Sequence, residues 1–212
     1  MENYMKYLIS IITFSLIFLS CAKKDEEDTA ATSCATDTTA SGSITVGSET
    51  LSGVYLSGCV DMTSQSGGNI FPSDVKGAKT AVVVTGDTAI TEEILMYTDT
   101  SCSTPSMTWK QVRSDFTLGS ASGSNYAVTY KDASIKVKPS TDVATSHINA
   151  LAASNSNITA TFTKDTETNV TSSGSTQYNL VLVTSTTVRT GESSDNATPS
   201  ELSSMEMTKA CQ

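Results

Sequence analysis

The sequence has few charged residues and a single histidine. Charged side chains make up 17% of the 212 residues, and 22 acidic residues outnumber 13 basic ones, which gives a net charge of −9. A nucleic-acid partner is therefore disfavoured, because no basic stripe is present to replace the counterions of a polyphosphate. With His147 as the only histidine, a catalytic triad has few possible members.

The short motifs that mark common active sites are also absent. There is no phosphate-binding loop, dinucleotide fingerprint or calcium loop, and Ala121 stands where a nucleophile elbow would need serine. Glu92 and Glu93 are adjacent in a predicted strand, so they point to opposite faces and cannot act as an acid–base pair. We interpret His147 as structural and Trp109 as a packing residue. The sequence predicts no catalytic residue, no cofactor and no metal site, and hence not an enzyme.

The chain begins with a short apolar run. Residues 7–19 are almost wholly apolar, follow Lys6 and end at Ser20 and Cys21. This length fits the hydrophobic region of a signal peptide and falls short of the roughly 20 residues that span a bilayer. The junction at Cys21 resembles a bacterial lipobox, and Phe18, three residues before the cysteine, resembles the permissive lipoboxes of spirochaetes.

The lipobox resemblance implies a lipoprotein signal peptide over residues 1–20 and lipidation of Cys21. Several acyl chains, at about 0.8 kcal/mol per buried CH₂, would hold the protein at a membrane. Ala22 favours the outer membrane by the sorting rule of enteric bacteria. Two alternatives stay open: ordinary cleavage after Ala22, because residues 20–22 also form a small-x-small site, and a start at Met5 instead of Met1.

Residues 21–42 are charged at first and then rich in Thr, Ala and Ser, which predicts a lipidated flexible tether. Residues 43–212 form the predicted single β domain. Their candidate strands are 51–59, 80–85, 89–97, 111–118, 125–130, 134–138, 158–163, 178–184 and 201–208. Turns are expected at Gly86-Asp87 and, more weakly, at residues 131–133.

One segment departs from the β pattern. Residues 141–154 have helical spacing, and Ser140 is the expected N-cap. The predicted apolar stripe of this helix consists of Val143, Ala144, His147, Ile148, Leu151 and Ala152. We therefore predict a mostly β fold, either an antiparallel up-and-down barrel or a sandwich, with one amphipathic helix near residues 140–154.

Four cysteines remain after Cys21, an even number in a compartment that permits disulfides. We favour Cys59 with Cys102, since each lies beside a strand-like segment, and Cys34 with Cys211, since both lie at the ends of the domain. The second bridge would close a loop of about 177 residues, stabilising by roughly 4 to 5 kcal/mol. Metal binding is the weaker alternative, because no two cysteines have a C-x₂₋₄-C spacing.

A second resemblance covers residues 50–209. Gly53-Val54-Tyr55 resembles the G-x-W of lipocalin-type barrels, with Tyr55 in place of the tryptophan, and the chain is similar to small exported bacterial lipocalin-like domains in which the two cysteines pair. Lys209 would correspond to the basic residue that the family has near its last strand.

Two functions are favoured over the third possibility, an enzyme. The first is a non-enzymatic, membrane-anchored envelope lipoprotein that displays loops or binds a partner protein. The second, implied by the lipocalin resemblance, is a carrier of a small apolar ligand. An open apolar cavity would favour the carrier. A filled interior would favour the display protein, and the residues expected to fill it are Tyr55, Val83, Leu95, Phe116, Val128 and Leu182.

Overall fold

A computed structural model describes residues 36–64, 70–156, 158–170 and 174–211. Strands dominate the described residues, and α2 (Asp142–Ser154) is the α-helix among them. The strands are β1 (Ile44–Val46), β2 (Glu49–Leu51), β3 (Val54–Leu56), β4 (Val60–Asp61), β5 (Gly77–Gly86), β6 (Ala89–Tyr97), β7 (Pro105–Ser122), β8 (Asn125–Pro139), β9 (Thr168–Val170), β10 (Thr176–Val183), β11 (Thr187–Thr190) and β12 (Met207–Cys211).

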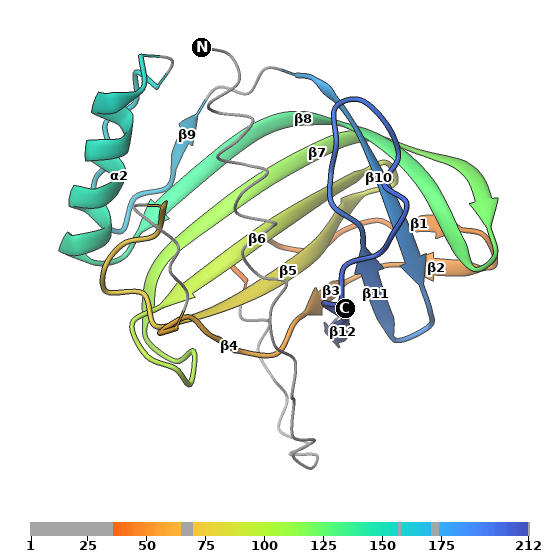
Figure 1. Ribbon diagram of the computed structural model, residues 1–212, viewed down its shortest axis with the longest axis horizontal. Helices are drawn as coiled ribbons and strands as arrows, with labels where there is room; N and C mark the ends of the chain where they lie inside the picture. Colours follow the sequence, from red (N-terminus) through yellow and green to blue (C-terminus); the bar gives the residue numbers. More distant parts are fainter. Residues whose placement is uncertain (1–35, 65–69, 157, 171–173, 212) are drawn as a thin grey trace.

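Hydrogen bonds join eight of these strands into a ring (Figure 1). The order is β3, β5, β6, β7, β8, β10, β11, β12 and back to β3, and every neighbouring pair is antiparallel. Ring strands that follow one another in sequence are neighbours, which is an up-and-down order. The prediction of a mostly β, antiparallel fold with one helix is confirmed. Closing the sheet on itself pairs edges that would otherwise be open.

Two predicted local features are absent, and a third is displaced, because the strand expected at residues 201–208 is β12, which begins at Met207. Residues 158–163 form no strand, because they lie against α2. There the side chain of Asn149 replaces a neighbouring strand: its Oδ1 accepts from the Phe162 N–H and its Nδ2 donates to the Phe162 carbonyl, each at 2.9 Å. The weak turn predicted at residues 131–133 is absent, since β8 continues through it. The β5–β6 turn after Gly86 is confirmed.

The inner face of the ring carries two apolar clusters. The first lies toward the β1–β2 hairpin, which contributes Ile44, Val46 and Leu51. The second lies toward α2, which contributes Ala144, Ile148 and Ala152. Along β6, Ile90 belongs to the first cluster and Met96 to the second, so the clusters occupy opposite ends of the same strands.

Three of the six residues expected to fill the interior do so. Tyr55, Phe116 and Val128 belong to the first cluster. Val83 and Leu95 are buried but lie on the opposite face, because the inward positions of β5 are Val82 and Val84. Leu182 is only half-buried, and its neighbours Val181 and Val183 take the inner positions. Side chains alternate along a strand, so displacing the pattern by one residue exchanges the two faces.

The predicted helix is present with two changes. Thr141, not Ser140, is the N-cap, and its hydroxyl accepts from the Ala144 N–H at 3.0 Å. Val143 was expected in the apolar stripe but is 44% exposed. The same Thr141 hydroxyl donates to Asp74, which ties the start of the helix to the loop before β5. No helix in the described part of the chain is long and apolar enough to cross a membrane.

Candidate functional site: a polar belt inside the ring

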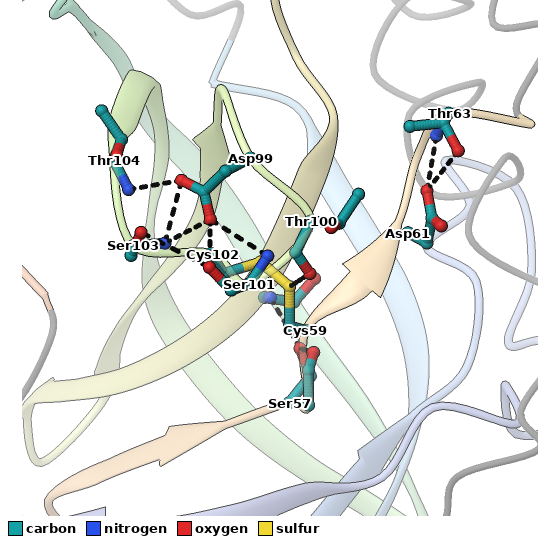
Figure 2. The surroundings of a disulfide bond; sticks show 12 residues. Ser57, Cys59, Asp61, Thr63, Asp99, Thr100, Ser101, Cys102, Ser103 and Thr104 are labelled. Atoms are coloured by element: carbon teal, nitrogen blue, oxygen red, sulfur yellow. Dashed lines mark hydrogen bonds between the residues drawn. A yellow bond between two sulfur atoms is a disulfide. The ribbon is translucent and has the colours of Figure 1, made fainter.

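The predicted disulfide between Cys59 and Cys102 is present, with an S–S distance of 2.06 Å (Figure 2). It joins the segment after β3 to the turn after β6. Gly77 lies directly beneath it, where a Cβ atom would come within 2.5 Å of the Asp99 carbonyl oxygen and 3.0 Å of the Cys102 Sγ. The disulfide therefore packs so closely against the start of β5 that position 77 has no room for a side chain.

Asp99 organises the turn that holds Cys102. Its carboxylate accepts hydrogen bonds from the Ser101 hydroxyl and from the backbone N–H groups of Ser101, Ser103 and Thr104. The hydrogen bond from the Ser101 hydroxyl, together with those from the backbone of Thr104 and Ser103, holds the pKa of Asp99 well below its ordinary value. This capping fixes the turn from which Cys102 reaches Cys59.

The other cysteine predictions concern residues outside the described ranges. Cys21 and Cys34 both lie there, so lipidation of Cys21 and the pairing of Cys34 with Cys211 stay predictions. Cys211 itself is disulfide-bonded.

The structure brings Tyr55 and Lys209 together. They are register partners across the β3–β12 pair, and the Lys209 Nζ lies 6.0 Å from the centre of the Tyr55 ring. The same Nζ donates to the Ser52 hydroxyl at 3.2 Å. The basic residue of the last strand therefore lies near the aromatic residue of the first ring strand.

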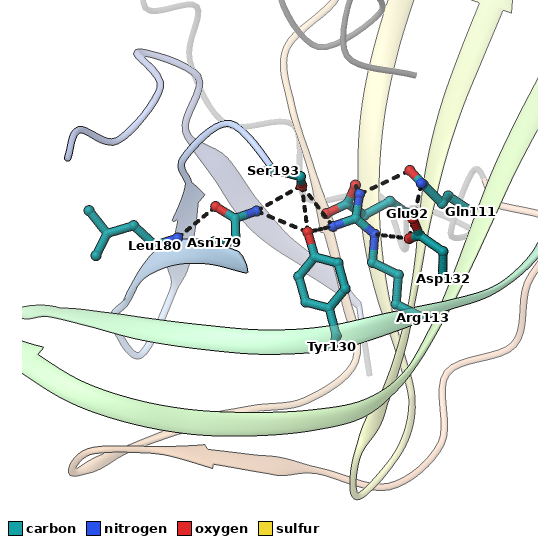
Figure 3. A network of polar contacts seen from close by, with 8 residues as sticks. All are labelled: Glu92, Gln111, Arg113, Tyr130, Asp132, Asn179, Leu180 and Ser193. Atoms are coloured by element: carbon teal, nitrogen blue, oxygen red, sulfur yellow. Dashed lines mark hydrogen bonds and ion pairs between the residues drawn. The ribbon is translucent and has the colours of Figure 1, made fainter. Parts of the chain in front are cut away.

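A polar belt lies along the inner face next to the first apolar cluster, to which its member Tyr130 also belongs. Figure 3 shows the residues of the belt. On β6 it is Glu92, between Ile90 and Met96; β7 contributes Gln111 and Arg113. The remaining members come from three further elements, and the whole belt is Glu92, Gln111, Arg113, Tyr130, Asp132, Asn179 and Ser193.

Arg113 is the centre of the belt and is 1% exposed. Its Nη2 lies 2.7 Å from the Glu92 Oε2 and donates to the Gln111 Oε1 at 2.9 Å. Its Nε lies 4.0 Å from the Asp132 Oδ1, and its guanidinium carbon is 4.2 Å from the centre of the Tyr130 ring. A buried guanidinium needs such partners, because an isolated charge in this setting would cost several kcal/mol.

Tyr130 extends the belt toward β10. Its hydroxyl accepts from the Arg113 Nη1 and lies 2.5 Å from the Ser193 hydroxyl. The Asn179 Nδ2 donates to both hydroxyls, at 3.3 Å to Tyr130 and 3.2 Å to Ser193. Asn179 Oδ1 accepts from the Leu180 N–H. The belt therefore ties β6, β7 and β8 to β10 and to the segment after β11.

Burial governs the ionisation of the belt. It raises the pKa of Asp132 despite the opposing charge of Arg113, and it raises the pKa of Tyr130 in the same way. One guanidinium faces two carboxylates, Glu92 and Asp132, so the belt has an excess of acid. The Nη1 and Nη2 nitrogens of Arg113 donate hydrogen bonds, whereas Nε has no hydrogen-bond partner among the described residues and lies 4.0 Å from the Asp132 carboxylate. An added anion would meet two carboxylates. The arrangement suits holding strands together better than binding an anionic ligand.

The belt residues were not predicted as a group from the sequence, where Glu92 stands out only through its neighbour Glu93. A usable signal existed: Gln111 and Arg113 are polar residues two apart in a strand whose neighbouring inward positions are apolar, and Tyr130 and Asp132 repeat the pattern on the next strand. His147 contacts the Ile70 carbonyl at 3.0 Å and lies apart from the belt, and Trp109 packs against the second apolar cluster.

No protein-family model matches the sequence, and no curated protein matches it.

Proposed function

We propose that this protein is a membrane-anchored envelope lipoprotein without enzymatic activity, whose β ring binds a protein partner through its exterior. The anchor is the lipid on Cys21, inferred from the short apolar leader that ends there, and the outer membrane is the favoured destination. The observation that supports exterior binding is the occupied inner face, which carries the two apolar clusters and the polar belt. Side chains that contact one another there are not free to contact a ligand.

The tip of the β7–β8 hairpin is the part of the ring best placed for a partner. Arg113 is the last β7 residue that pairs with β6, and β7 continues to Ser122, so the hairpin extends past β6 (Figure 1). Residues 117–124 are all exposed and contain no charge, and Leu118 is 38% exposed. An uncharged strand that projects beyond its neighbour is suited to contact with another protein surface.

A carrier of a small apolar ligand is the second candidate. Two features favour it: the up-and-down ring, which is the architecture of many carriers, and the pairing of Lys209 with Tyr55. Native mass spectrometry of gently extracted protein separates the two candidates. A reproducible bound small molecule would establish the carrier, and repeated preparations without one would count against it.

The anchor is tested by labelling. Cells that express the full chain are grown with labelled palmitate, alongside a Cys21→Ser variant. We expect label in the wild-type protein, partition into the detergent phase, and loss of both in the variant. An unlabelled wild-type protein in the aqueous phase, with a mature N-terminus at Lys23, would overturn the anchor.

A further inference from the structure

Residues 36–42 lie against the outer face of the ring, although they belong to the predicted flexible tether. We call this segment the strap. At one end the Asp37 Oδ2 lies 2.9 Å from the Lys138 Nζ on β8. At the other end the Ser41 N–H donates to the Val84 carbonyl at 2.8 Å and the Ser41 hydroxyl donates to the Thr85 carbonyl at 3.0 Å, both on β5.

The strap lies next to a buried acid on the same face. Glu93 on β6 is 0% exposed, and neither of its carboxylate oxygens has a hydrogen-bond partner in the part of the chain that the structure describes. Thr38 and the backbone of Asp37, both in the strap, approach this carboxylate without meeting hydrogen-bond geometry. A buried carboxylate without such bonds is destabilised when it is ionised.

The cation nearest to Glu93 is Lys110, which lies closer to another carboxylate, that of Glu167. The Lys110 Nζ is 3.9 Å from the Glu93 Oε1 but 2.6 Å from the Glu167 Oε2. Burial raises the pKa of Glu167, but the hydrogen bond from Lys110 and the charges of Lys110 and Lys136 lower it by more, so Glu167 stays ionised and retains Lys110. Glu93 therefore receives only a distant share of one positive charge.

The other groups that face Glu93 do not compensate it. Ala81 on β5 is its uncharged register partner, and Thr91, Leu95 and Tyr97 are the neighbouring outward positions of β6. Asp37 in the strap is a second acid, whose charge is matched by Lys138. The hydrogen bond to Asp37 raises the pKa of Lys138, so this pair keeps its lysine charged across the neutral range.

We propose that residues 36–42 form a pH-sensitive strap, which docks on the outer face while Glu93 is protonated and releases when that carboxylate ionises. With the strap docked, burial raises the pKa of Glu93. In the proposed released state the side chain is exposed to water and its pKa returns toward the ordinary value. The docked state therefore binds the proton more tightly, and docking weakens as pH rises through the raised pKa. Each unit of difference between the two pKa values changes the docking equilibrium tenfold.

The test is hydrogen exchange of the purified full chain between about pH 5 and pH 8, corrected for the intrinsic rate and followed by mass spectrometry. We expect protection of the Ser41 amide to fall severalfold or more as pH rises. Glu93→Gln, a neutral variant of the same shape, should keep the strap protected at every pH. Glu206→Gln, at an exposed position, should behave as wild type.

Two results would overturn the proposal: protection of residues 36–42 that does not change with pH in the wild type, or an unchanged pH slope in Glu93→Gln. Lys138→Ala separates the strength of docking from its pH dependence. This variant should weaken the protection of residues 36–42 at every pH and leave the change of protection with pH as in the wild type. Protection of β7 peptides must stay constant throughout, which shows that the ring remains folded.

Release has a consequence if the chain is anchored as proposed above. At about 3.5 Å per residue, freeing the strap adds up to about 25 Å to the reach between Cys21 and the ring. Only this consequence depends on the anchor. Failure of palmitate labelling would remove it and leave the exchange result intact.

Discussion

Glu92 and Glu93 are neighbours in β6 and lie on opposite faces of the sheet. Glu92 is paired with Arg113 inside the ring at 2.7 Å, and Glu93 is buried on the outside, 3.9 Å from Lys110. Glu92 shares its buried cation with the more distant Asp132, and Glu93 shares a lysine with Glu167, to which that lysine is closer. Two adjacent glutamates on opposite faces of one strand therefore have different surroundings. Glu92 is ion-paired at 2.7 Å, whereas Glu93 has no hydrogen-bond partner among the described residues.

Arg113→Met should destabilise the ring by about 3 to 5 kcal/mol, because it leaves Glu92 and Asp132 buried without their cation. Urea unfolding, followed by the fluorescence of Trp109, measures the change. Lys131→Ala is the matched control: its partner Asp115 and Lys131 itself are largely exposed, so a change within about 0.5 kcal/mol is expected. Similar losses in the two variants would show that the belt is not a major source of stability.

Stability should depend on pH through Asp132. Burial raises its pKa in the folded protein, so the folded state binds a proton more tightly than the unfolded state. Its stabilising effect is complete below the ordinary pKa of about 3.8 and is lost as pH rises through the raised value. Asp132→Asn should reduce this loss of folding stability with rising pH. The urea unfolding midpoints of the variant and the wild type, measured across the same pH range, give the comparison. An identical pH profile in the variant would exclude Asp132 as its source.

Removing the disulfide with Cys59→Ala and Cys102→Ala together should lower the unfolding free energy by about 4 kcal/mol, the chain-entropy value for a loop of 43 residues. Thermal unfolding without reductant measures this effect. Reduction of the wild type is not an adequate substitute, because Cys211 is disulfide-bonded as well. A double variant as stable as wild type would show that the Asp99 turn and the packing around β5 hold this region alone.

Gly77→Ala should destabilise by about 1 to 3 kcal/mol, because the new methyl group would collide with the Asp99 carbonyl, a backbone atom that cannot move independently. Gly58→Ala is the control, since nothing lies within 4 Å of its Cβ position. Unfolding midpoints of the two variants give the comparison. Equal midpoints would mean that the Asp99 turn shifts at little cost.

Local patterns predicted much of the fold. Alternation around Tyr126, Val128 and Tyr130 placed β8, and helical spacing placed α2 within two residues of its start. Alternation alone was insufficient at residues 158–163, since the same spacing lets Ile158, Ala160 and Phe162 pack against the helix while the Asn149 amide satisfies the backbone at Phe162. A strand needs a neighbour, and no local pattern states whether one is present.

The face assignments show the same limit. The pattern in β5 is a continuous apolar run, so it could not say whether Val82 or Val83 faces inward. The belt also escaped prediction, because Glu92, Arg113, Asp132 and Asn179 are separated along the chain and each alone is an ordinary polar residue in a strand.

The sequence by itself determined the apolar run that precedes Cys21, the mostly β composition, the position of the helix, and cysteines suited to disulfides. These follow from spacing and side-chain chemistry within short segments. Only the tertiary structure decided the ring order, the inward residues, the belt around Arg113 and the strap over Glu93. The reason is physical: burial and pairing are set by groups distant in the chain, and the same carboxylate is ion-paired, exposed or protonated according to what folds against it.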